Sequence, residues 1–332
     1  MVYNELGESG IKVSAITFGA WAIGGFMWGG SDEKKGIDAI KRGYDMGVTS
    51  IDTAPIYGLG LSEELVGNAI KGNRENYQIL TKFVMRWKKA GTQEEFSSQK
   101  GYDELWENVF LDARKESIMK EAEDSLRRLG TDYIDYYQMH WPVEDVPMDE
   151  TMEALVQLKE QGKIRAAGVC NFSAEQLMEA EKTVRIEGDQ VPYNMVRRDI
   201  EKDVVPYVVK NNKGIIAYSP MQRGLLSGKF RPDTQLAEGD NRRDSRYFKA
   251  ENIRKVNEML SKIKPIADAH NATLAQLALS WTLHQPGVIS ALAGSRDPQQ
   301  IEDNAKAADL KLDEEELQTM HGYLEELKLE DA

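Results

Sequence analysis

The sequence contains very little cysteine and histidine. A single cysteine, Cys170, excludes an internal disulfide, and four histidines without zinc-type spacing give no reason to expect a metal site. No apolar run reaches the roughly 18 residues of a transmembrane helix. The N-terminal stretch MVYNELGESGIKV has neither the basic nor the apolar segment of a signal peptide. We therefore expect a cytoplasmic protein with no metal and no membrane partner.

Positive charge is also in deficit. The 332 residues include 42 lysines and arginines against 55 aspartates and glutamates, which gives a net charge of -13. An acidic chain without a long basic run is not expected to bind nucleic acid, although a small anion needs only a local positive pocket. The 41% of hydrophobic residues suffice for a large core, which excludes disordered and collagen-like classes.

Short apolar runs alternate along the chain with longer segments of helical spacing. Eight runs predict strands, at 14–21, 48–52, 77–82, 133–140, 164–169, 190–193, 214–219 and 287–294. Helices are expected between them, at 33–46, 62–71, 115–129, 149–161, 173–183, 199–211 and 273–284. Eight such units without a break in composition indicate one α/β domain over 1–332, a (β/α)8 TIM barrel. A doubly wound open sheet is the alternative.

Three segments lie outside this alternation. The first 13 residues predict a hairpin that caps the barrel floor. Long polar inserts follow the third strand, at 84–114, and the seventh strand, at 220–250. Both inserts leave the carboxyl ends of strands, where barrel enzymes build their sites, so we expect them to set substrate preference. Insertion into a tolerant surface loop, without a function, is the alternative. The sequence indicates no oligomeric state.

Four chemically active side chains are expected on one rim of this barrel. Asp52, Lys82 and His140 end the second, third and fourth strands, and Tyr57 follows Asp52 by five residues. Each alone has a structural explanation, such as a helix cap or a buried stem. Together they suit proton transfer to a carbonyl oxygen: an ammonium lowers the pKa of a phenol, a carboxylate holds that ammonium, and an imidazole donates a hydrogen bond.

Several motifs follow one another over nearly the whole chain: IDTAPIYGLGLSEELVG, ILTK, DYIDYYQMHWP, GVCNFS, QVPYNMVRR, AYSPMQRGLLSGKF and GSRDPQQIEDN. In this order they resemble the aldo-keto reductase superfamily, in particular its bacterial aldehyde-reductase and general-stress branch. The resemblance implies a barrel that binds NADPH, or less often NADH, at the strand carboxyl ends. It also implies hydride transfer to aldehydes or ketones, with Tyr57 as the acid supported by Lys82, Asp52 and His140.

The resemblance further implies which residues contact the cofactor and the substrate. Asn171 and Gln190 would bind the nicotinamide carboxamide, and Tyr218 would stack on its ring. Further cofactor contacts would come from Gly19, Ala20, Trp21, Asp52, Ser219, Leu225, Gly228, Lys229, Gly294, Ser295, Arg296, Gln300 and Asn304. A small-molecule carbonyl substrate would contact Trp21, Tyr57, Trp87, His140 and Trp141, an apolar wall over the nicotinamide.

Two departures from the family pattern affect these expectations. Cys170 stands where GVSNF has serine, and we expect an inert buried thiol there. The segment AGSR lacks the lysine that some branches use for a 2′-phosphate. We therefore expect Arg296 and Ser295 to select NADPH over NADH, with pairing of Arg296 to a surface acid as the alternative.

Two other functions stay open at this point. A Schiff-base lyase would use Lys82 as its nucleophile, but that chemistry needs a neutral amine, whereas Asp52 would keep Lys82 charged. A cofactor-binding regulatory subunit of the same fold would turn over slowly, and the sequence has no obvious partner-binding extension.

Overall fold

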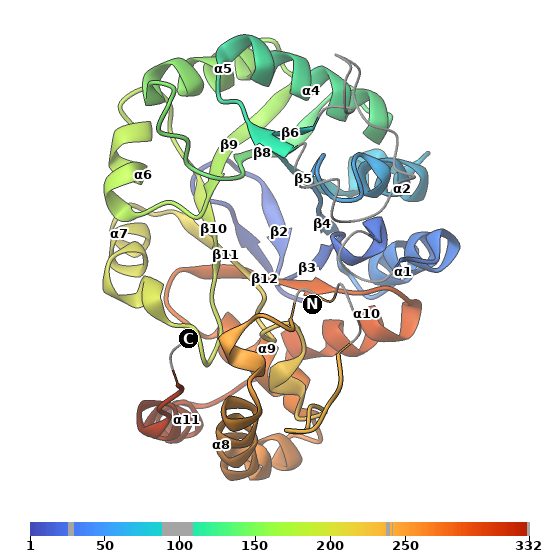
Figure 1. The fold of residues 1–332 in the computed structure, drawn as a ribbon. Coiled ribbons are helices and arrows are strands. Elements are labelled where there is room, and N and C mark those ends of the chain that lie inside the picture. The colour runs from blue at the N-terminus through green and yellow to red at the C-terminus, as the bar shows by residue number, and fades with distance from the viewer. Residues whose placement is uncertain (26–29, 88–108, 237–239, 241, 331–332) are drawn as a thin grey trace.

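The computed structural model describes residues 1–25, 30–87, 109–236, 240 and 242–330, and its centre is a closed parallel barrel (Figure 1). The pairing of β12 with β3, from Ala291 opposite Ile16 to Gly294 opposite Gly19, closes the sheet. The closure confirms the barrel and excludes the open doubly wound sheet. In chain order, the barrel strands are β3 (Ile16–Gly19), β4 (Ser50–Asp52), β5 (Gln78–Phe83), β8 (Ile134–Met139), β9 (Ile164–Cys170), β10 (Gly188–Pro192), β11 (Gly214–Tyr218) and β12 (Val288–Gly294).

The strands are buried on both faces, as continuous apolar runs predict. All six residues of β8 are buried, and its side chains alternate between the two faces of the sheet. Tyr137 and Met139 pack in the layer shared with the helices, whereas Tyr136 belongs to the cluster inside the barrel. Gln138 therefore points to the interior, on the same face as Tyr136.

Helices surround the barrel and begin at the predicted signals. Asp32 and Ser173 accept hydrogen bonds from the third backbone amide after them, and Ser173 forms a full capping box with Gln176. These outer helices are α1 (Glu33–Asp45), α2 (Leu61–Ile70), α4 (Lys115–Leu129), α5 (Met148–Glu160), α6 (Ala174–Ala180), α7 (Val204–Lys210), α9 (Leu274–Leu283) and α10 (Pro298–Ala305). Two more helices, α8 (Ala250–Ala269) and α11 (Glu314–Glu326), pack together beside α9, in the lower part of Figure 1.

The continuous helix predicted over 199–211 is wrong. A 3-10 turn (Asp199–Lys202) is followed by the separate helix α7. The reason is Pro206, which lacks an amide hydrogen and whose ring would clash with the carbonyl of Lys202 in a continuous helix. The helix therefore restarts at Val204.

The N-terminal hairpin closes the floor of the barrel as predicted. Strands β1 (Tyr3–Glu5) and β2 (Lys12–Ser14) pair antiparallel. Leu6, Ile11 and Val13 are buried in one cluster with barrel residues such as Leu80. The hairpin therefore leaves the opposite end of the barrel, at the strand carboxyl ends, as the end available for a site.

Both predicted inserts contain secondary structure in their described residues. In the first, β6 (Met85–Trp87) pairs antiparallel with β7 (Val109–Leu111), while 88–108 lies outside the described residues. The second contains 3-10 turns at Leu225–Ser227 and Arg246–Phe248, and 237–239 and 241 lie outside the described residues. The described ends of both inserts leave the carboxyl ends of β5 and β11.

A buried acid supports the backbone where β5 leads into β6. Val84 has a φ of 83°, which a β-branched residue rarely adopts, and its amide donates to Glu121 Oε1 of α4 at 3.4 Å. Burial raises the pKa of Glu121 from 4.5 to about 8, against the opposing effects of Arg86 and Arg128, and Asp112 adds to the rise. Glu121 therefore keeps its proton in the folded protein at pH values where the unfolded chain releases it.

Glu121→Gln should remove a loss of stability that the wild-type protein suffers between about pH 5 and pH 8. In that window the folded state holds one more proton than the unfolded state, so the free energy of unfolding falls as pH rises. In thermal melts at pH 5 and pH 9, the free energy of unfolding of the variant should rise relative to wild type by on the order of 2 kcal/mol at the higher pH. Glu123→Gln, on the exposed side of α4, is the control. Parallel pH curves for wild type and Glu121→Gln would contradict this assignment.

Candidate active site

The four expected catalytic side chains meet at the carboxyl end of the barrel. Lys82 Nζ donates to Asp52 Oδ1 at 2.6 Å and to the Thr53 carbonyl at 2.8 Å. The same nitrogen lies 4.8 Å from the centre of the Tyr57 ring. The rings of Tyr57 and His140 meet edge to face with their centres 5.8 Å apart. The structure thus places the phenol between an ammonium and an imidazole.

Close backbone packing positions the loop that carries Tyr57. A Cβ added to Gly24 would come within 2.9 Å of the Tyr57 carbonyl, and one added to Gly58, whose φ is 65°, would come within 2.3 Å of the Gly24 carbonyl. Glycine is therefore required at both positions. The Trp21 ring then stacks on Tyr57, with centres 6.0 Å apart and planes at 28°. These contacts hold the phenol rigidly at the rim.

Burial dominates the electrostatics of this group. Burial acts to lower the pKa of Lys82, but the adjacent Asp52 raises it and prevails, so Lys82 is charged. Burial raises the pKa of Tyr57; Lys82 opposes this, as predicted, but the net shift is upward rather than downward. Burial and the charge of Lys82 hold the pKa of His140 well below its usual range. At neutral pH the site therefore presents a protonated phenol and a neutral imidazole.

Two glutamines lie beneath this group. Gln190 Nε2 donates to Asp52 Oδ2 at 2.7 Å, and Gln138 Nε2 donates to the same oxygen at 3.3 Å. Gln138 is a site residue that the strand pattern does not single out. The available signal is a polar residue inside the buried run IDYYQM, two positions before His140 and therefore on the same strand face.

The expected nicotinamide residues form a linked set next to His140. Tyr218 donates through its hydroxyl to Asn171 Oδ1 at 2.9 Å, and Asn171 Nδ2 donates to the His140 carbonyl at 3.1 Å. Asn171 has a left-handed backbone, with φ at 63°. Burial raises the pKa of Tyr218 to about 12, although Arg197 and Arg223 act against it. These side chains are thus fixed in place at the rim.

The loop after β11 presents an unusual backbone to the mouth. Ser219, Gln222 and Arg223 have φ values of 53°, 46° and 51°, in the left-handed region. Asn194 stabilises the loop because its Nδ2 donates to the Ser219 carbonyl and to Gln222 Oε1, at 3.0 and 2.7 Å. Such strain is concentrated at functional sites. Farther along, Leu225 is buried, Gly228 has a φ of 71° and Lys229 is exposed.

The expected adenosine residues gather where β12 leads into α10. Asp297 caps α10 by accepting from the Gln300 amide at 3.0 Å, and Gln300 Oε1 accepts from the Arg296 amide at 2.9 Å. Asn304 Nδ2 donates to the buried Ser295 Oγ at 3.2 Å. A helix N-terminus with an arginine beside it favours a phosphate.

On the first strand, Gly19 lies against Gly294, since an added Cβ would be in ordinary van der Waals contact with the Gly294 amide nitrogen, at 3.4 Å. The Ala20 amide then donates to the Asp52 carbonyl at 2.8 Å. The first contact joins the first strand to the last, and the second joins the first strand to the second, which ends at Asp52. They also place Gly19, Ala20 and Trp21 beside the catalytic group.

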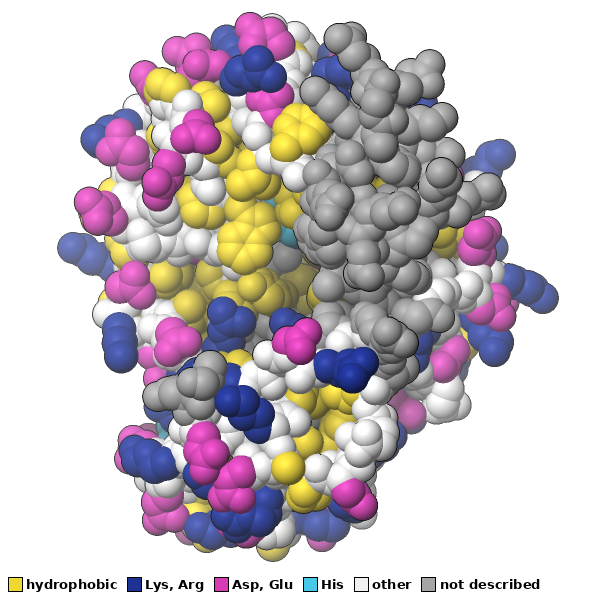
Figure 2. All heavy atoms as spheres, viewed as in Figure 1, with side chains coloured by type: hydrophobic (Ala, Val, Ile, Leu, Met, Phe, Trp, Pro, Cys, Tyr) yellow, Lys and Arg dark blue, Asp and Glu magenta, His cyan; other side chains and the backbone are white. Residues whose placement is uncertain are grey.

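The three expected tryptophans of the substrate wall differ in exposure. Trp141 is 42% exposed next to His140, whereas Trp87 is only 6% exposed and packs with Ile56 and Leu59 beneath the Tyr57 loop. Figure 2 shows hydrophobic side chains gathered in the hollowed middle of this face, above several Lys and Arg side chains. The structure thus brings Trp21 and Trp141 to the mouth and places Trp87 behind the loop.

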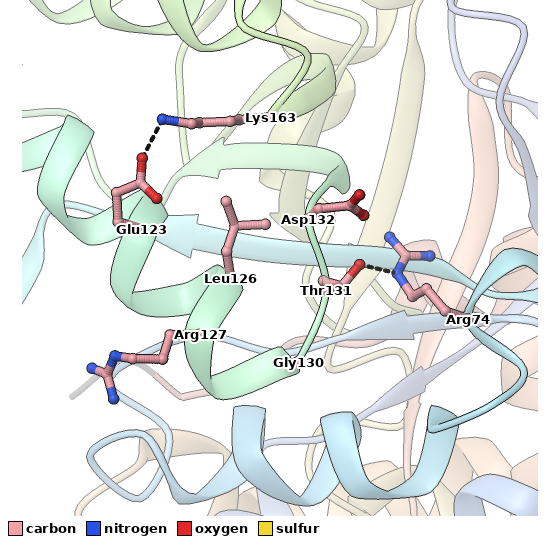
Figure 3. A pocket seen from close by; sticks show the side chains of 8 residues that line it. All are labelled: Arg74, Glu123, Leu126, Arg127, Gly130, Thr131, Asp132 and Lys163. Carbon is pink, nitrogen blue, oxygen red and sulfur yellow. Dashed lines mark hydrogen bonds and ion pairs between the residues drawn. The ribbon is translucent and has the colours of Figure 1, made fainter.

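A separate depression lies at the other end of the barrel (Figure 3). Its residues Thr131, Asp132 and Lys163 precede β8 and β9, and Arg74 precedes β5. Arg74 is used structurally, since it donates to Asp135 Oδ2 at 2.7 Å. The amino end of barrel strands serves stability, so this depression is not part of the active site.

Two absences apply to the described part of the chain. No helix there could span a membrane. No group of three or more histidine, cysteine, aspartate or glutamate side chains there could hold a metal ion.

The fold and the site together define a barrel oxidoreductase, and the comparisons specify its family. The model of the Aldo/keto reductase family matches residues 15–325. The chain belongs to this family and is an NAD(P)H-dependent oxidoreductase. The expected family resemblance is thereby confirmed.

Relatives match over nearly their whole length. Aldo-keto reductase YhdN of Bacillus subtilis (strain 168) is 37% identical over 328 residues, covering 98% of this chain and 94% of that protein. The NADH-specific methylglyoxal reductase of Escherichia coli (strain K12) is 35% identical over 329 residues, covering 97% and 98%. The structure of the glycerol dehydrogenase AKR11B4 from Gluconobacter oxydans matches with a TM-score of 0.88 at 36% identity, covering 98% and 95%.

Proposed function

We propose that residues 1–332 act as one domain that reduces a small aldehyde or ketone to an alcohol with NADPH, with Tyr57 as the general acid. The observation that carries this proposal is the placement of a protonated, partly buried phenol between Lys82 and the neutral imidazole of His140. The apolar mouth beside Trp21 and Trp141 supports a substrate with an apolar part.

The residues at the strand ends fit a dinucleotide. The open space beside the Gly294 backbone and the left-handed backbone at Ser219 leave main-chain groups open to close contact, and the start of α10 suits a phosphate. Asn171, Gln190 and Tyr218 would hold the nicotinamide end, and Arg296 the adenosine end. When bound, the cofactor supplies the hydride.

The chain's own residues then control the proton. His140 donates to the substrate carbonyl oxygen as negative charge develops, and the Tyr57 hydroxyl gives its proton to that oxygen. Lys82 stabilises the phenolate left on Tyr57, and Asp52 keeps Lys82 charged and oriented. Trp21 and Trp141 limit the access of water to the reacting atoms.

The test is a cofactor-oxidation screen against aldehydes, ketones, quinones and sugars, with NADPH and NADH in parallel. Measurable turnover of simple aldehydes supports an enzyme over a regulatory subunit of the same fold. A charged Lys82 argues against the Schiff-base lyase, because that chemistry needs a neutral amine. A covalent adduct on Lys82 after borohydride treatment with a carbonyl compound would favour the lyase instead.

Cofactor preference is a finer part of the proposal. Arg296 follows β12 at the start of α10, where its guanidinium can form a bidentate pair with a 2′-phosphate. Ser295 lies beside it and is fixed by Asn304. These residues favour NADPH, in contrast to the Escherichia coli relative, which is named NADH-specific.

Arg296→Ala should weaken NADPH binding by about 10- to 100-fold and leave NADH binding nearly unchanged. The loss corresponds to roughly 1.5–3 kcal/mol for a hydrogen bond to a charged group. The measurement is fluorescence titration of both cofactors at low salt. Lys229→Ala, near the expected pyrophosphate, should instead weaken both cofactors equally. Equal affinity of the wild-type protein for NADPH and NADH would show that Arg296 does not discriminate.

A further inference from the structure

The two oxygens of Asp52 are held by different partners. Oδ1 accepts from Lys82 Nζ at 2.6 Å, while Oδ2 accepts from Gln190 at 2.7 Å and from Gln138 at 3.3 Å. All four side chains are buried. Because the two amides fix Oδ2, they also fix the direction in which Oδ1 faces Lys82.

Gln138 is the centre of this network. Its Nε2 donates to Asp52, and its Oε1 accepts from Gln190 Nε2 at 3.2 Å and faces the Cys170 thiol at 3.8 Å. A carboxylate only accepts hydrogen bonds, so the amide nitrogen must face Asp52 and the amide oxygen must face the two donors. An amide satisfies both sides at once, whereas an apolar side chain of the same size satisfies neither.

The same bonds determine which end of Gln190 is available. An amide nitrogen carries two hydrogens, and those of Gln190 are directed to Asp52 and to Gln138. Any hydrogen bond from Gln190 to a cofactor carboxamide would therefore use the Gln190 oxygen as an acceptor. Gln138 thus contacts both Asp52, which holds Lys82 beside Tyr57, and Gln190, the residue expected to bind the cofactor.

We infer that Gln138 is a positioning residue that fixes Asp52 toward Lys82 and orients Gln190 for the cofactor. The inference rests on the proposed role of Tyr57. The ionisable groups around the phenol are Lys82, Asp52, Cys170 and His140.

The negative charge of Asp52 opposes phenolate formation on Tyr57. A hydrogen bond from Gln138 disperses that charge, so its loss should make the phenolate harder to form. The inference therefore has a consequence in the ionisation of Tyr57 itself, which a purely structural role for Gln138 would not produce.

Gln138→Met is the test, because it keeps the size of the side chain and removes both hydrogen-bonding ends. In alcohol oxidation, where Tyr57 acts as a base, the midpoint of the pH profile should move up by about half a pH unit or more. The kcat should fall about 3- to 10-fold, with little change in the KM of the carbonyl substrate. NMR of protein labelled at the tyrosine Cζ carbon gives a cofactor-free readout: the Tyr57 signal should begin to titrate at higher pH.

Two further variants keep the result interpretable. Tyr137→Phe changes the outward face of the same strand, where the hydroxyl has no hydrogen-bond partner among the described residues, and should leave the midpoint unchanged. Gln138→Asn withdraws the amide by one methylene, so the midpoint of its pH profile should shift in the same direction. This variant provides the test if Gln138→Met does not fold. An unmoved midpoint in both Gln138 variants overturns the inference. If Tyr57→Phe keeps its turnover, the proposed function fails instead, so the two failures are distinguishable.

Discussion

Replacing Tyr57 by phenylalanine is expected to lower carbonyl reduction by about 10²- to 10⁴-fold, the usual contribution of a general acid. Only the phenolic hydroxyl is lost, because the ring that stacks on Trp21 and meets His140 edge to face is retained. Cofactor affinity should stay nearly unchanged. The measurements are steady-state reduction of an aldehyde at saturating substrate and fluorescence titration of the cofactor.

The Tyr57→Phe result needs a fold control, since the phenol is partly buried and packed against its neighbours. The thermal midpoint of the variant should match that of the wild type, because the packing of the loop depends on Gly24, Gly58 and the Tyr57 backbone rather than on the hydroxyl. Tyr137→Phe, at a fully buried tyrosine outside the site, should keep full activity. A Tyr57→Phe protein with most of its wild-type turnover would remove Tyr57 from the role of acid.

The architecture was accessible from the sequence because its signals are local. Buried strands such as β8 read as unbroken apolar runs, and caps such as Asp32 and Ser173 mark helix starts in the chain itself. The break between the 3-10 turn and α7 also has a local signal, Pro206. This signal competes with the apolar periodicity, which favours one continuous helix. Helix periodicity alone therefore overextends such a segment.

The details of the site depend on distances that no local pattern specifies. Strand order predicts that Asp52, Lys82 and His140 share one rim. It does not predict the hydrogen bonds that the side-chain amides of Gln138 and Gln190 donate to Asp52 Oδ2. The direction of the Tyr57 pKa shift also depends on burial, which outweighs Lys82 only in the folded structure. A polar residue inside a buried strand is the one sequence signal that points to such a network.

Lys82→Met is expected to impair both reaction directions and the stability of the fold. Lys82 is the main group that opposes the upward shift of the Tyr57 pKa, so its loss raises that pKa further. Alcohol oxidation requires the phenolate, so its pH profile should move to higher pH, and the loss of activity at neutral pH should be about 10²-fold or more. The pH dependence of alcohol oxidation measures this directly, and an unmoved profile with retained activity would exclude Lys82 from the role.

Stability separates the two roles of Lys82. Lys82→Met leaves the buried carboxylate of Asp52 without its cation, which should cost about 3–5 kcal/mol. The double variant Asp52→Asn, Lys82→Met removes both charges and should recover most of that stability, because no unpaired charge remains buried. Its activity should stay low, since neither change restores an ammonium beside Tyr57. A double variant that regains activity along with stability would mean that Lys82 matters only for folding, whereas recovery of stability alone assigns the ammonium to the chemistry of the phenol.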